Sequence, residues 1–389
     1  MNFDTLIQQF YNRYGRNSTP IRLFFAPGRV NLIGEHTDYN GGYVFPCALS
    51  FGTYLMMREN HQQVLRLATT NFEFTSEISL GEPIRKINEA WVNYPLGVIK
   101  ELQSRGLIIT GYDLLYSGNI PNNAGLSSSA SIELVTAVAF DKLFDLDIGR
   151  VELVKIGQAA ENNFVGVNCG IMDQFAVGMG QKDHALFLNC NTLDYEAVPV
   201  NLVDYQLVIA NTNKSRGLAD SKYNERVTEC NKAVRAISKG KPIQYLAELN
   251  NHEFSEYAHL IPDQTILKRA RHVVSENQRV FEAVDALKSG RLTTFGQLMN
   301  ASHDSLRDDY EVTGIELDTL VEESRKIEGV IGSRMTGAGF GGCTVSLVKN
   351  EAVREMMARA GEAYHLKTGL KADFYPADIG DGAKEITNL

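Results

Sequence analysis

The sequence predicts a two-lobed protein of the α/β or α+β class. Strand-like and helix-like segments alternate through both halves of the chain, as expected when sheets and helices pack in layers. The 389 residues suffice for two or three domains with sizeable cores. No repeat or low-complexity tract interrupts the alternation. We expect lobes over residues 1–195 and 196–389.

The first lobe is expected to combine a sheet with several helices. Apolar residues at helical spacing predict helices over 1–14, 84–103, 132–140 and 151–164, the second of which contains the only tryptophan, Trp91. Strands are expected at 21–25, 43–57, 64–68, 111–120 and 184–189. Residues 28–42 read as a polar loop, and 170–180 as a glycine-spaced segment.

The second lobe is expected to be richer in helix. Strands are predicted at 196–200 and 205–210, a long charged helix over 217–237, and mostly helix over 243–326. The charge runs 268–272 and 304–309 are interpreted as solvated faces, as are the histidines outside residues 28–42. Two strands joined by a glycine-rich turn are expected at 329–348, then a helix over 351–364 and a strand at 370–375.

Composition excludes several classes of function. The net charge of −9, from 38 basic and 47 acidic residues, argues against a nucleic-acid surface, so local groups would have to bind any anionic substrate. Five scattered cysteines without a C-x-x-C pair argue against a disulfide framework or structural zinc. Neither a signal pattern nor a membrane-spanning stretch is visible. These observations favour a cytoplasmic protein.

A serine-rich loop at 121–131 separates the strand at 111–120 from the apolar helix after it. Its small side chains, free backbone N–H groups and helix N-terminus are what a phosphate cradle requires. The alternative is that the serines only cap the helix.

The run Gly28–Gly42 is the densest group of ionisable residues. It holds Arg29, Glu35, His36 and Asp38 among glycines, and carboxylates of this kind can orient a small polyol. The alternatives are a solvated turn, or an iron site in which His36 and Asp38 share a metal with a distant histidine.

Two further glycine patterns are not nucleotide fingerprints. Gly337–Gly342 matches G-x-G-x-x-G, but it leads into a strand rather than a helix. Gly240-Lys241 is followed by proline where a Walker A motif needs Ser or Thr.

Downstream, Glu161 and Asp173 lie among apolar neighbours. Each is either a structural carboxylate or part of a kinase site, which needs one carboxylate on a metal and another near the attacking hydroxyl. Tyr223 lies at a helical position that core packing explains equally well.

Together these motifs resemble the galactokinase branch of the GHMP small-molecule kinase family. The resemblance rests on 27–39, 121–131, Gly170–Gln174, the Tyr223 helix and 335–342, and so spans nearly the whole chain. It implies the two-lobed α+β fold of that family, with mixed sheets, packed helices and an active site in the cleft between the lobes. It also implies ATP-dependent phosphorylation of the C1 hydroxyl of α-D-galactose, with Mg²⁺ as cofactor, galactose and MgATP as the molecules bound, and no obligate protein partner.

Residue by residue, the resemblance implies Asp173 as catalytic base and Arg29 as transition-state stabiliser. An arginine beside Asp173 would keep that carboxylate ionised. The remaining positions implied are those that bind sugar (Glu35, His36, Thr37, Asp38, Gly170, Tyr223), nucleotide (Thr69, Asn123, Ala124, Gly125, Leu126, Ser127, Ser128, Ser129) and Mg²⁺ (Ser129, Glu161).

Two alternatives stay open. A related kinase for N-acetylgalactosamine or another small alcohol would share the phosphate loop and differ in the pocket. A non-catalytic galactose sensor would be expected to have lost the base or altered the serine loop, and both are intact in this sequence.

Overall fold

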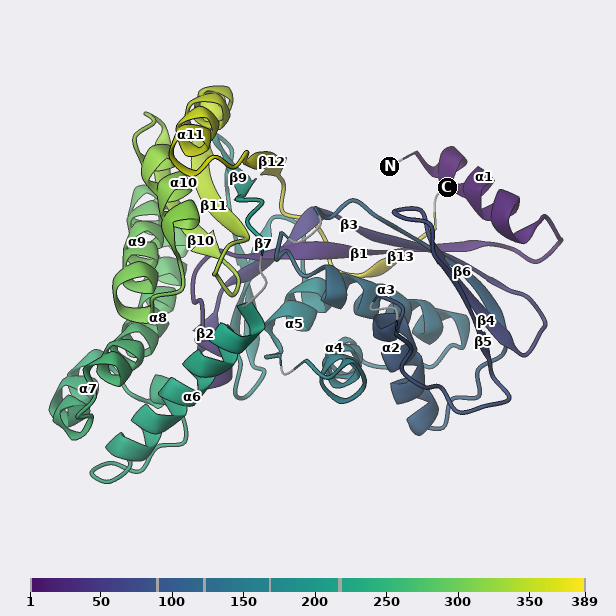
Figure 1. Ribbon diagram of the computed structural model, residues 1–389, viewed down its shortest axis with the longest axis horizontal. Coiled ribbons are helices and arrows are strands. Elements are labelled where there is room, and N and C mark those ends of the chain that lie inside the picture. Colours follow the sequence, from purple (N-terminus) through teal and green to yellow (C-terminus); the bar gives the residue numbers. More distant parts are fainter. Residues whose placement is uncertain (1, 89–90, 122–123, 168, 216–218, 388–389) are drawn as a thin grey trace.

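The computed structural model describes residues 2–88, 91–121, 124–167, 169–215 and 219–387, and contains three sheets with helices packed on them (Figure 1). This arrangement confirms the predicted α+β class. Within the described residues, no helix is long and apolar enough to cross a bilayer.

The largest sheet has six strands, in the order β13-β1-β3-β6-β4-β5, and only β4 and β6 run parallel. The strands are β1 (Arg22–Asn31), β3 (Pro46–Glu59), β4 (Val64–Thr69), β5 (Thr75–Ser79), β6 (Tyr112–Gly118) and β13 (Lys384–Ile386). Side chains alternate between the two faces of a strand. Accordingly, Leu23 packs in the core beneath the N-terminal helix, whereas Phe24 packs in the larger core on the opposite face.

Helices cover both faces of this sheet. The N-terminal helix α1 (Phe3–Tyr14) lies on one face, and its apolar stripe buries Leu6 and Phe10 (Figure 1). The opposite face carries α2 (Asn93–Ser104), α3 (Ser128–Leu143), α4 (Arg150–Ala159), a π-helical turn (Ala160–Val165) and α5 (Met172–Met179).

The C-terminal half places helices against a four-stranded antiparallel sheet. That sheet has the order β10 (Val330–Thr336), β11 (Cys343–Lys349), β9 (Tyr205–Asn211), β12 (Asp373–Ala377). The main helices here are α6 (Ala219–Ile237), α7 (Asn251–Tyr257), α8 (Gln264–Lys288), α9 (Leu292–Ser305), α10 (Ile315–Arg325) and α11 (Val353–Thr368), with a π-helical turn at Leu306–Tyr310.

Single 3₁₀ turns occur in both halves of the chain, at Asp38–Asn40, Leu246–Glu248, Ala258–Leu260 and Asn350–Ala352.

The two halves share a core. A three-stranded sheet of β2 (Tyr43–Val44), β7 (His184–Asn189) and β8 (Tyr195–Pro199) lies between them. One apolar cluster joins Val30 and Leu32 of the first half to Val280 and Phe295 of the second. The C-terminal strand β13 returns to pair with β1. The division at residue 195 stays a prediction.

Three predicted elements were wrong in their boundaries. The strand predicted at 21–25 continues to Asn31, so Arg29 lies on β1 and not in a loop; a register shift after Pro27 absorbs the proline and glycine. The helix predicted from residue 84 begins at Asn93, so Trp91 precedes it and packs edge-on against Tyr116. Residues 172–179 form helix α5, whereas the glycine spacing of 170–180 had led us to expect no helix there.

The interpretation of the charge runs and outer histidines as solvated is wrong at three positions. Arg269 is 2% exposed, and His272 and His303 are fully buried. Helix α8 packs against α6, α9 and the π-helical turn at once, so it has more than one buried face. A charged side chain can lie on such a face when partners satisfy it.

Candidate active site

Arg29 and Asp173 form an ion pair at the centre of the predicted site. Arg29 lies on β1 and is nearly buried, and Asp173 lies in the first turn of α5. Arg29 Nε donates to Asp173 Oδ1 at 2.9 Å and Nη2 to Oδ2 at 3.0 Å, a two-pronged geometry. The Asp173 side chain is still 30% exposed. A ligand can therefore reach a carboxylate that the arginine already holds in place.

Arg29 also fixes the serine loop. Its Nη1 donates to the Gly125 carbonyl at 2.7 Å, and its backbone N–H donates to the Leu126 carbonyl at 3.1 Å. Ser127 follows at the N-terminus of α3, but its side chain makes no capping bond and donates instead to Asp173 Oδ2 at 2.5 Å. The helix-cap alternative is therefore wrong for Ser127. Its φ of +60° is a strained value of the kind found at functional loops.

The remaining residues of the loop differ in exposure. Ala124 and Leu126 are buried, Ser128 is exposed and Ser129 is half-buried. Asn123 lies outside the described residues. The first N–H groups of α3 have no acceptor within the helix and carry its positive dipole end, so they suit a phosphate.

The late glycine run connects two antiparallel strands. Residues 337–342 join β10 to β11, which confirms the predicted turn and the rejection of a dinucleotide fingerprint. Gly337 has a φ of +85°, and a Cβ there would lie 3.3 Å from the Gly125 carbonyl. Its N–H donates to Glu35 Oε1 at 2.8 Å. This turn therefore contacts both the serine loop and the loop after β1.

Glu35 is buried and held by the second half of the chain. Besides Gly337, its Oε1 accepts from Thr336 Oγ1 at 3.1 Å and from Arg334 Nη1 at 3.3 Å. The hydroxyl of Thr37 lies 2.8 Å from the Gly34 carbonyl and 2.7 Å from that of Tyr43. These contacts show that both side chains shape the loop itself.

His36 is buried in an aromatic cluster. Its Nδ1 lies 2.9 Å from the Tyr39 hydroxyl, and the ring also hydrogen-bonds to the backbone of Ala338. Burial, followed by the positive charge that His272 can carry, lowers the pKa of His36 to about 3, so the ring is neutral at physiological pH. Its φ of +63° is a second strained position.

Asp38, Gly170 and Tyr223 line one pocket of about 740 Å³. A Cβ on Gly170 would lie 2.0 Å from Asp38 Oδ2, so only glycine leaves room for that carboxylate. Burial, followed by the charge of Asp173, raises the pKa of Asp38 to about 7. The pocket is therefore lined by residues from both halves of the chain and holds an acidic group whose charge changes near neutral pH.

Glu161 and Ser129 lie together beside a second buried carboxylate. A hydrogen bond joins the Ser129 hydroxyl to Glu161. Gln174 Nε2 donates to Glu161 Oε2 at 2.7 Å and to Glu133 Oε2 at 3.0 Å. Burial, followed by the charge of Asp173, raises the pKa of Glu161, and Glu133 Oε1 is buried without a partner.

These oxygen donors suit Mg²⁺, which uses one or two protein carboxylates together with substrate phosphates. A cation would also relieve the repulsion among the carboxylates. No group of three His, Cys, Asp or Glu among the described residues is placed to hold a metal alone. Phosphate oxygens would thus have to complete the coordination, and the iron-site alternative for His36 and Asp38 has no third ligand there.

Thr69 ends β4 and pairs with Tyr116 of the parallel strand β6, which leads to the serine loop. It is buried, and its hydroxyl donates to Asn71 Oδ1 at 3.2 Å. The structure thus places Thr69 at the same end of the sheet as the loop.

Sequence reasoning missed the residues that hold the loop after β1 from behind. Glu276 of α8 is fully buried and accepts from the Gly34 N–H at 2.9 Å and from Arg279 Nε at 2.7 Å. Burial alone would raise the pKa of Glu276, but Arg279, His272 and Arg334 lower it to about 2. Arg334 is also fully buried and donates to the Asn31 carbonyl at 2.9 Å. No motif surrounds Glu276, and Arg334 lies just before the glycine run 335–342, which gives no sign of this role.

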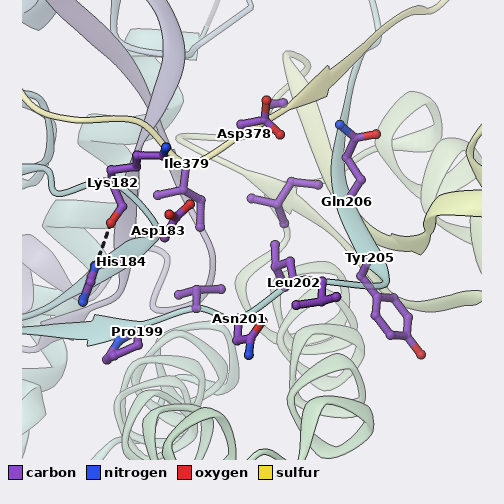
Figure 2. A pocket seen from close by; sticks show the side chains of 14 residues that line it. Lys182, Asp183, His184, Pro199, Asn201, Leu202, Tyr205, Gln206, Asp378 and Ile379 are labelled. Carbon is purple, nitrogen blue, oxygen red and sulfur yellow. Dashed lines mark hydrogen bonds between the residues drawn. The ribbon is translucent and has the colours of Figure 1, made fainter.

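A second pocket, of about 570 Å³, lies away from these residues (Figure 2). It is bordered by β7, β9 and β12 and contains none of the predicted site residues. His184 Nδ1 lies 2.7 Å from the Lys182 carbonyl, and this hydrogen bond, drawn in Figure 2, accounts for one of the polar groups at the edge of the pocket.

Three family matches cover much of the chain. Residues 8–59 match the galactokinase galactose-binding signature, 93–181 the GHMP kinases N-terminal domain, and 283–365 the GHMP kinases C-terminal domain. The first match spans β1 and the loop after it, the second spans the serine loop and α5, and the third spans the late glycine turn.

Curated relatives and solved structures agree with these matches. The galactokinase of Fusobacterium nucleatum is 55% identical, over 98% of this chain and 99% of its own length, and that of Bacillus subtilis is 53% identical, over 94% and 95%. The structure of the Lactococcus lactis galactokinase complexed with galactose superposes with a TM-score of 0.95 at 48% identity, over 99% of this chain and 100% of that one. A mevalonate kinase at 20% identity and TM-score 0.68 shares the fold. The chain therefore belongs to the galactokinase family of the GHMP kinases.

Proposed function

We propose that this protein transfers the γ-phosphoryl group of ATP to the C1 hydroxyl of α-D-galactose. The observation that carries the proposal is the Arg29–Asp173 pair, whose partly open carboxylate lies between the serine loop and the pocket lined by Gly170. The full-length similarity to a galactokinase crystallised with galactose supports the choice of sugar.

Asp173 is the proposed base. It takes the proton of the C1 hydroxyl as the sugar oxygen forms a bond to the γ-phosphorus and the bond to the β-phosphate oxygen of ADP breaks. Arg29 holds Asp173 in place through two hydrogen bonds, and its positive charge also stabilises charge on the transferring group. Ser127, which donates to the same carboxylate, links the base to the nucleotide loop.

The sugar would be held by the loop after β1, Gly170 and Tyr223. Asp38 supplies a carboxylate for sugar hydroxyls, and His36 packs behind the rings of Tyr39 and Tyr223 that line the pocket. Glu35 and Thr37 contribute by fixing the loop, as their contacts support. Tyr223 provides an aromatic wall from α6.

The nucleotide would lie along the serine loop, residues 123–129, with Thr69 at its edge. Ser129 and Glu161 would hold Mg²⁺, which when bound neutralises part of the triphosphate charge that a chain of net charge −9 cannot. ATP as co-substrate also favours the cytoplasm as the place of action.

The Mg²⁺ assignment is tested by Ser129→Ala and Glu161→Ala. Each is expected to raise the Mg²⁺ concentration needed for half-maximal rate by about tenfold, because one ligand is lost. A titration of rate against Mg²⁺ measures this, with Glu152→Ala on the exposed side of α4 as control. If both variants titrate like the wild type, the assignment is wrong.

The reaction itself is tested by a coupled ADP-release assay. Galactose, N-acetylgalactosamine, glucose, mevalonate and homoserine are supplied in turn with MgATP. We expect rapid release with galactose alone. Release with N-acetylgalactosamine in its place would reassign the substrate, and galactose binding without release would indicate a sensor.

A further inference from the structure

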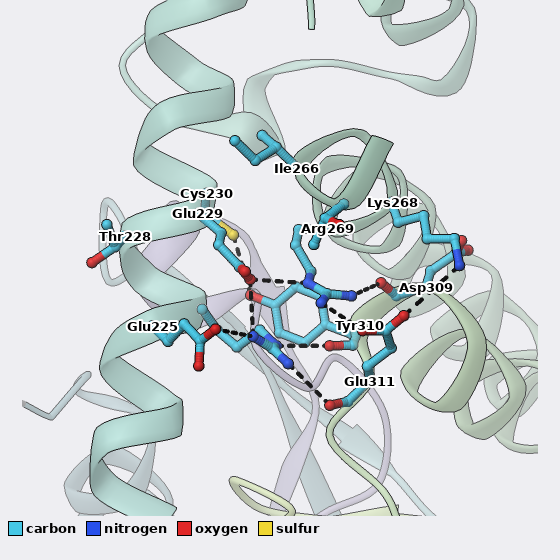
Figure 3. Close-up of polar contacts among 12 residues, drawn as sticks. Glu225, Thr228, Glu229, Cys230, Ile266, Lys268, Arg269, Asp309, Tyr310 and Glu311 are labelled. Atoms are coloured by element: carbon cyan, nitrogen blue, oxygen red, sulfur yellow. Dashed lines mark hydrogen bonds and ion pairs between the residues drawn. The ribbon is translucent and has the colours of Figure 1, made fainter. Parts of the chain in front are cut away.

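Two buried arginines, Arg226 and Arg269, donate hydrogen bonds to the backbone at the end of the π-helical turn Leu306–Tyr310; Figure 3 labels Arg269 beside Asp309, Tyr310 and Glu311. Arg269 donates to the Asp309 carbonyl at 2.5 Å, and Arg226 donates to the carbonyls of Tyr310 at 2.8 Å and Glu311 at 3.1 Å. The last carbonyls of a helix lack donors within it, so these guanidinium groups satisfy them. The turn that ends at Tyr310 is therefore held at its backbone.

The charge of the two arginines is matched within the same cluster. Glu229 Oε2 accepts from Arg226 Nη1 at 3.0 Å and from Arg269 Nε at 2.9 Å. Glu311 Oε2 accepts from Arg269 Nη2 at 2.7 Å. The two arginines are buried and Glu229 nearly so, whereas Glu311 is 49% exposed. The buried part of such a cluster, once satisfied, fixes one arrangement of the helices that contribute to it. Here these are α6, α8 and the segment after α9 (Figure 3).

The cluster fixes the position of the fully buried Tyr310 side chain. Its hydroxyl lies 2.7 Å from that of Tyr39 and 3.2 Å from Cys230 Sγ. Its ring centroid is 4.8 Å from that of His36 and 4.5 Å from that of His272. Tyr310 thus contacts His36 with its ring and reaches it again through the Tyr39 hydroxyl.

Cys230, Tyr310, Tyr39 and His36 form one chain of hydrogen bonds, which ends at His36 Nδ1. Each hydroxyl has a single hydrogen, so all the bonds run in the same direction along the chain. That direction decides whether Nδ1 is donor or acceptor and gives Nε2 the opposite role. The ring also hydrogen-bonds to the backbone of Ala338, so it is held from a second side.

Arg226 also helps to position Tyr223, which lines the pocket. Arg226 lies one turn after Tyr223 on α6, on the same side of the helix. The Tyr223 ring is 5.8 Å from that of His36 and 5.2 Å from that of Tyr39, and it lines the pocket. Anchoring Arg226 to the Tyr310 carbonyl therefore fixes α6 relative to the sugar loop.

We propose that Tyr310 is a positioning residue for sugar recognition: through its hydroxyl and its ring it holds Tyr39 and the His36 ring in one orientation. The proposal rests on the proposed function, because it assumes that the sugar binds in the pocket that Tyr39 and Tyr223 line. The nucleotide and the Arg29–Asp173 pair have no part in this chain of contacts.

The test is Tyr310→Phe, which removes only the hydroxyl. Because the Tyr39 hydroxyl then loses the partner that holds it against His36, we expect the KM for galactose to rise about five- to tenfold, with kcat and the KM for ATP within about twofold of wild type. The matched control is Tyr364→Phe, since Tyr364 is also fully buried and donates to the Thr212 carbonyl at 2.7 Å, outside the cluster. An equal change in galactose KM for the two variants would overturn the proposal.

A double-mutant cycle separates positioning from general destabilisation. Tyr39→Phe breaks the same chain one step nearer to His36, so the double variant is expected to raise the galactose KM no further than Tyr39→Phe alone. If the double variant instead raises the galactose KM by the product of the two single effects, the two hydroxyls do not act through one chain of hydrogen bonds. Cys230→Ser keeps a hydrogen-bonding group and is expected to stay within about twofold of wild type. The Cys230→Ser variant remains informative if Tyr310→Phe does not fold, because a change in galactose KM larger than twofold would contradict the proposed chain of hydrogen bonds.

Failure of the proposed function would be seen separately. In that case the wild-type protein itself would release no ADP with galactose, whereas failure of the inference alone leaves the wild type active and Tyr310→Phe indistinguishable from Tyr364→Phe.

Discussion

Two arginine–aspartate pairs in the N-terminal half have similar hydrogen bonds but different surroundings. Arg58 and Asp113 face each other across β3 and β6, with Nη2 2.8 Å from Oδ2, and their side chains are 2% and 1% exposed. In the Arg29–Asp173 pair the arginine is equally enclosed at 5%, but the carboxylate is 30% exposed.

The partners of the two pairs explain the difference. Asp113 Oδ1 accepts also from Asn60 and Arg66, and Arg58 donates to the Tyr14 and Gly15 carbonyls at the end of α1. That pair joins α1 to the sheet and has no room for a ligand. Arg29–Asp173 instead joins a strand to a loop and to a helix that borders the pocket. An ion pair whose carboxylate stays reachable is suited to chemistry, and an enclosed pair to stability.

The largest effect is expected when the geometry of the open pair is changed without its charge. Arg29→Lys keeps a cation but loses the two-pronged hold on Asp173 and the bond to Gly125, so we expect turnover to fall about 100-fold or more. Steady-state ADP release measures this, and thermal unfolding should change little. A turnover within about threefold of wild type would show that charge alone suffices.

The next largest effect concerns the enclosed pair. Asp113→Asn leaves Arg58 buried without its counter-charge, so we expect the free energy of unfolding to fall by about 3 kcal/mol. Denaturant unfolding measures it. Turnover per folded molecule is expected to equal that of the wild type; a large loss there would mean that the enclosed pair also serves the site.

The smallest effect concerns Asp38, a third carboxylate that lines the pocket. Its pKa of about 7 means that it is largely protonated at pH 6 and ionised at pH 8, and it faces the charges of Asp173 and Glu35. If sugar hydroxyls donate to the ionised form, galactose binds about tenfold more weakly at pH 6 than at pH 8. Calorimetric titration at several pH values measures this.

Protonation of Asp38 has opposite effects on galactose binding, which it weakens, and on the stability of the folded protein, which it raises. Because the folded pKa is raised above the ordinary value of 3.8, the contribution of Asp38 to stability is lost as pH rises from about 4 to 7. His36, whose folded pKa is lowered to about 3, contributes stability that is lost as pH falls from about 6.5 to 3, because only the unfolded chain binds the proton in that range. An Asp38→Asn variant should bind weakly at every pH, and a flat wild-type profile would contradict the assignment.

Local sequence patterns predicted the parts of the site that lie on continuous segments. The serine loop, the acidic run after β1 and the glycine turn before β11 each carry unusual residues within a short window. Such windows keep their residues together in space whatever the rest of the fold does. The pairing of Arg29 with Asp173, 144 residues apart, came only from resemblance to a family.

What the sequence did not reveal depends on packing between distant elements. Arg269 reads as part of a solvated charge run because its partners Glu229 and Glu311 are about 40 residues away on either side. Glu276 and Arg334 contact the loop after β1 from α8 and β10; no motif surrounds Glu276, and Arg334 lies just before the glycine run without being part of it. Burial on more than one face of a helix is a tertiary property, which a single-helix pattern cannot show.

The role of Asp173 is tested most directly by Asp173→Asn, with turnover and galactose affinity measured on one preparation. Asparagine fills the same space and can still bond Arg29 through its oxygen, but it cannot take a proton. We expect ADP release to fall about 1000-fold while calorimetry gives a galactose Kd within about threefold of wild type. Turnover near the wild-type rate would contradict the assignment of Asp173 as the base.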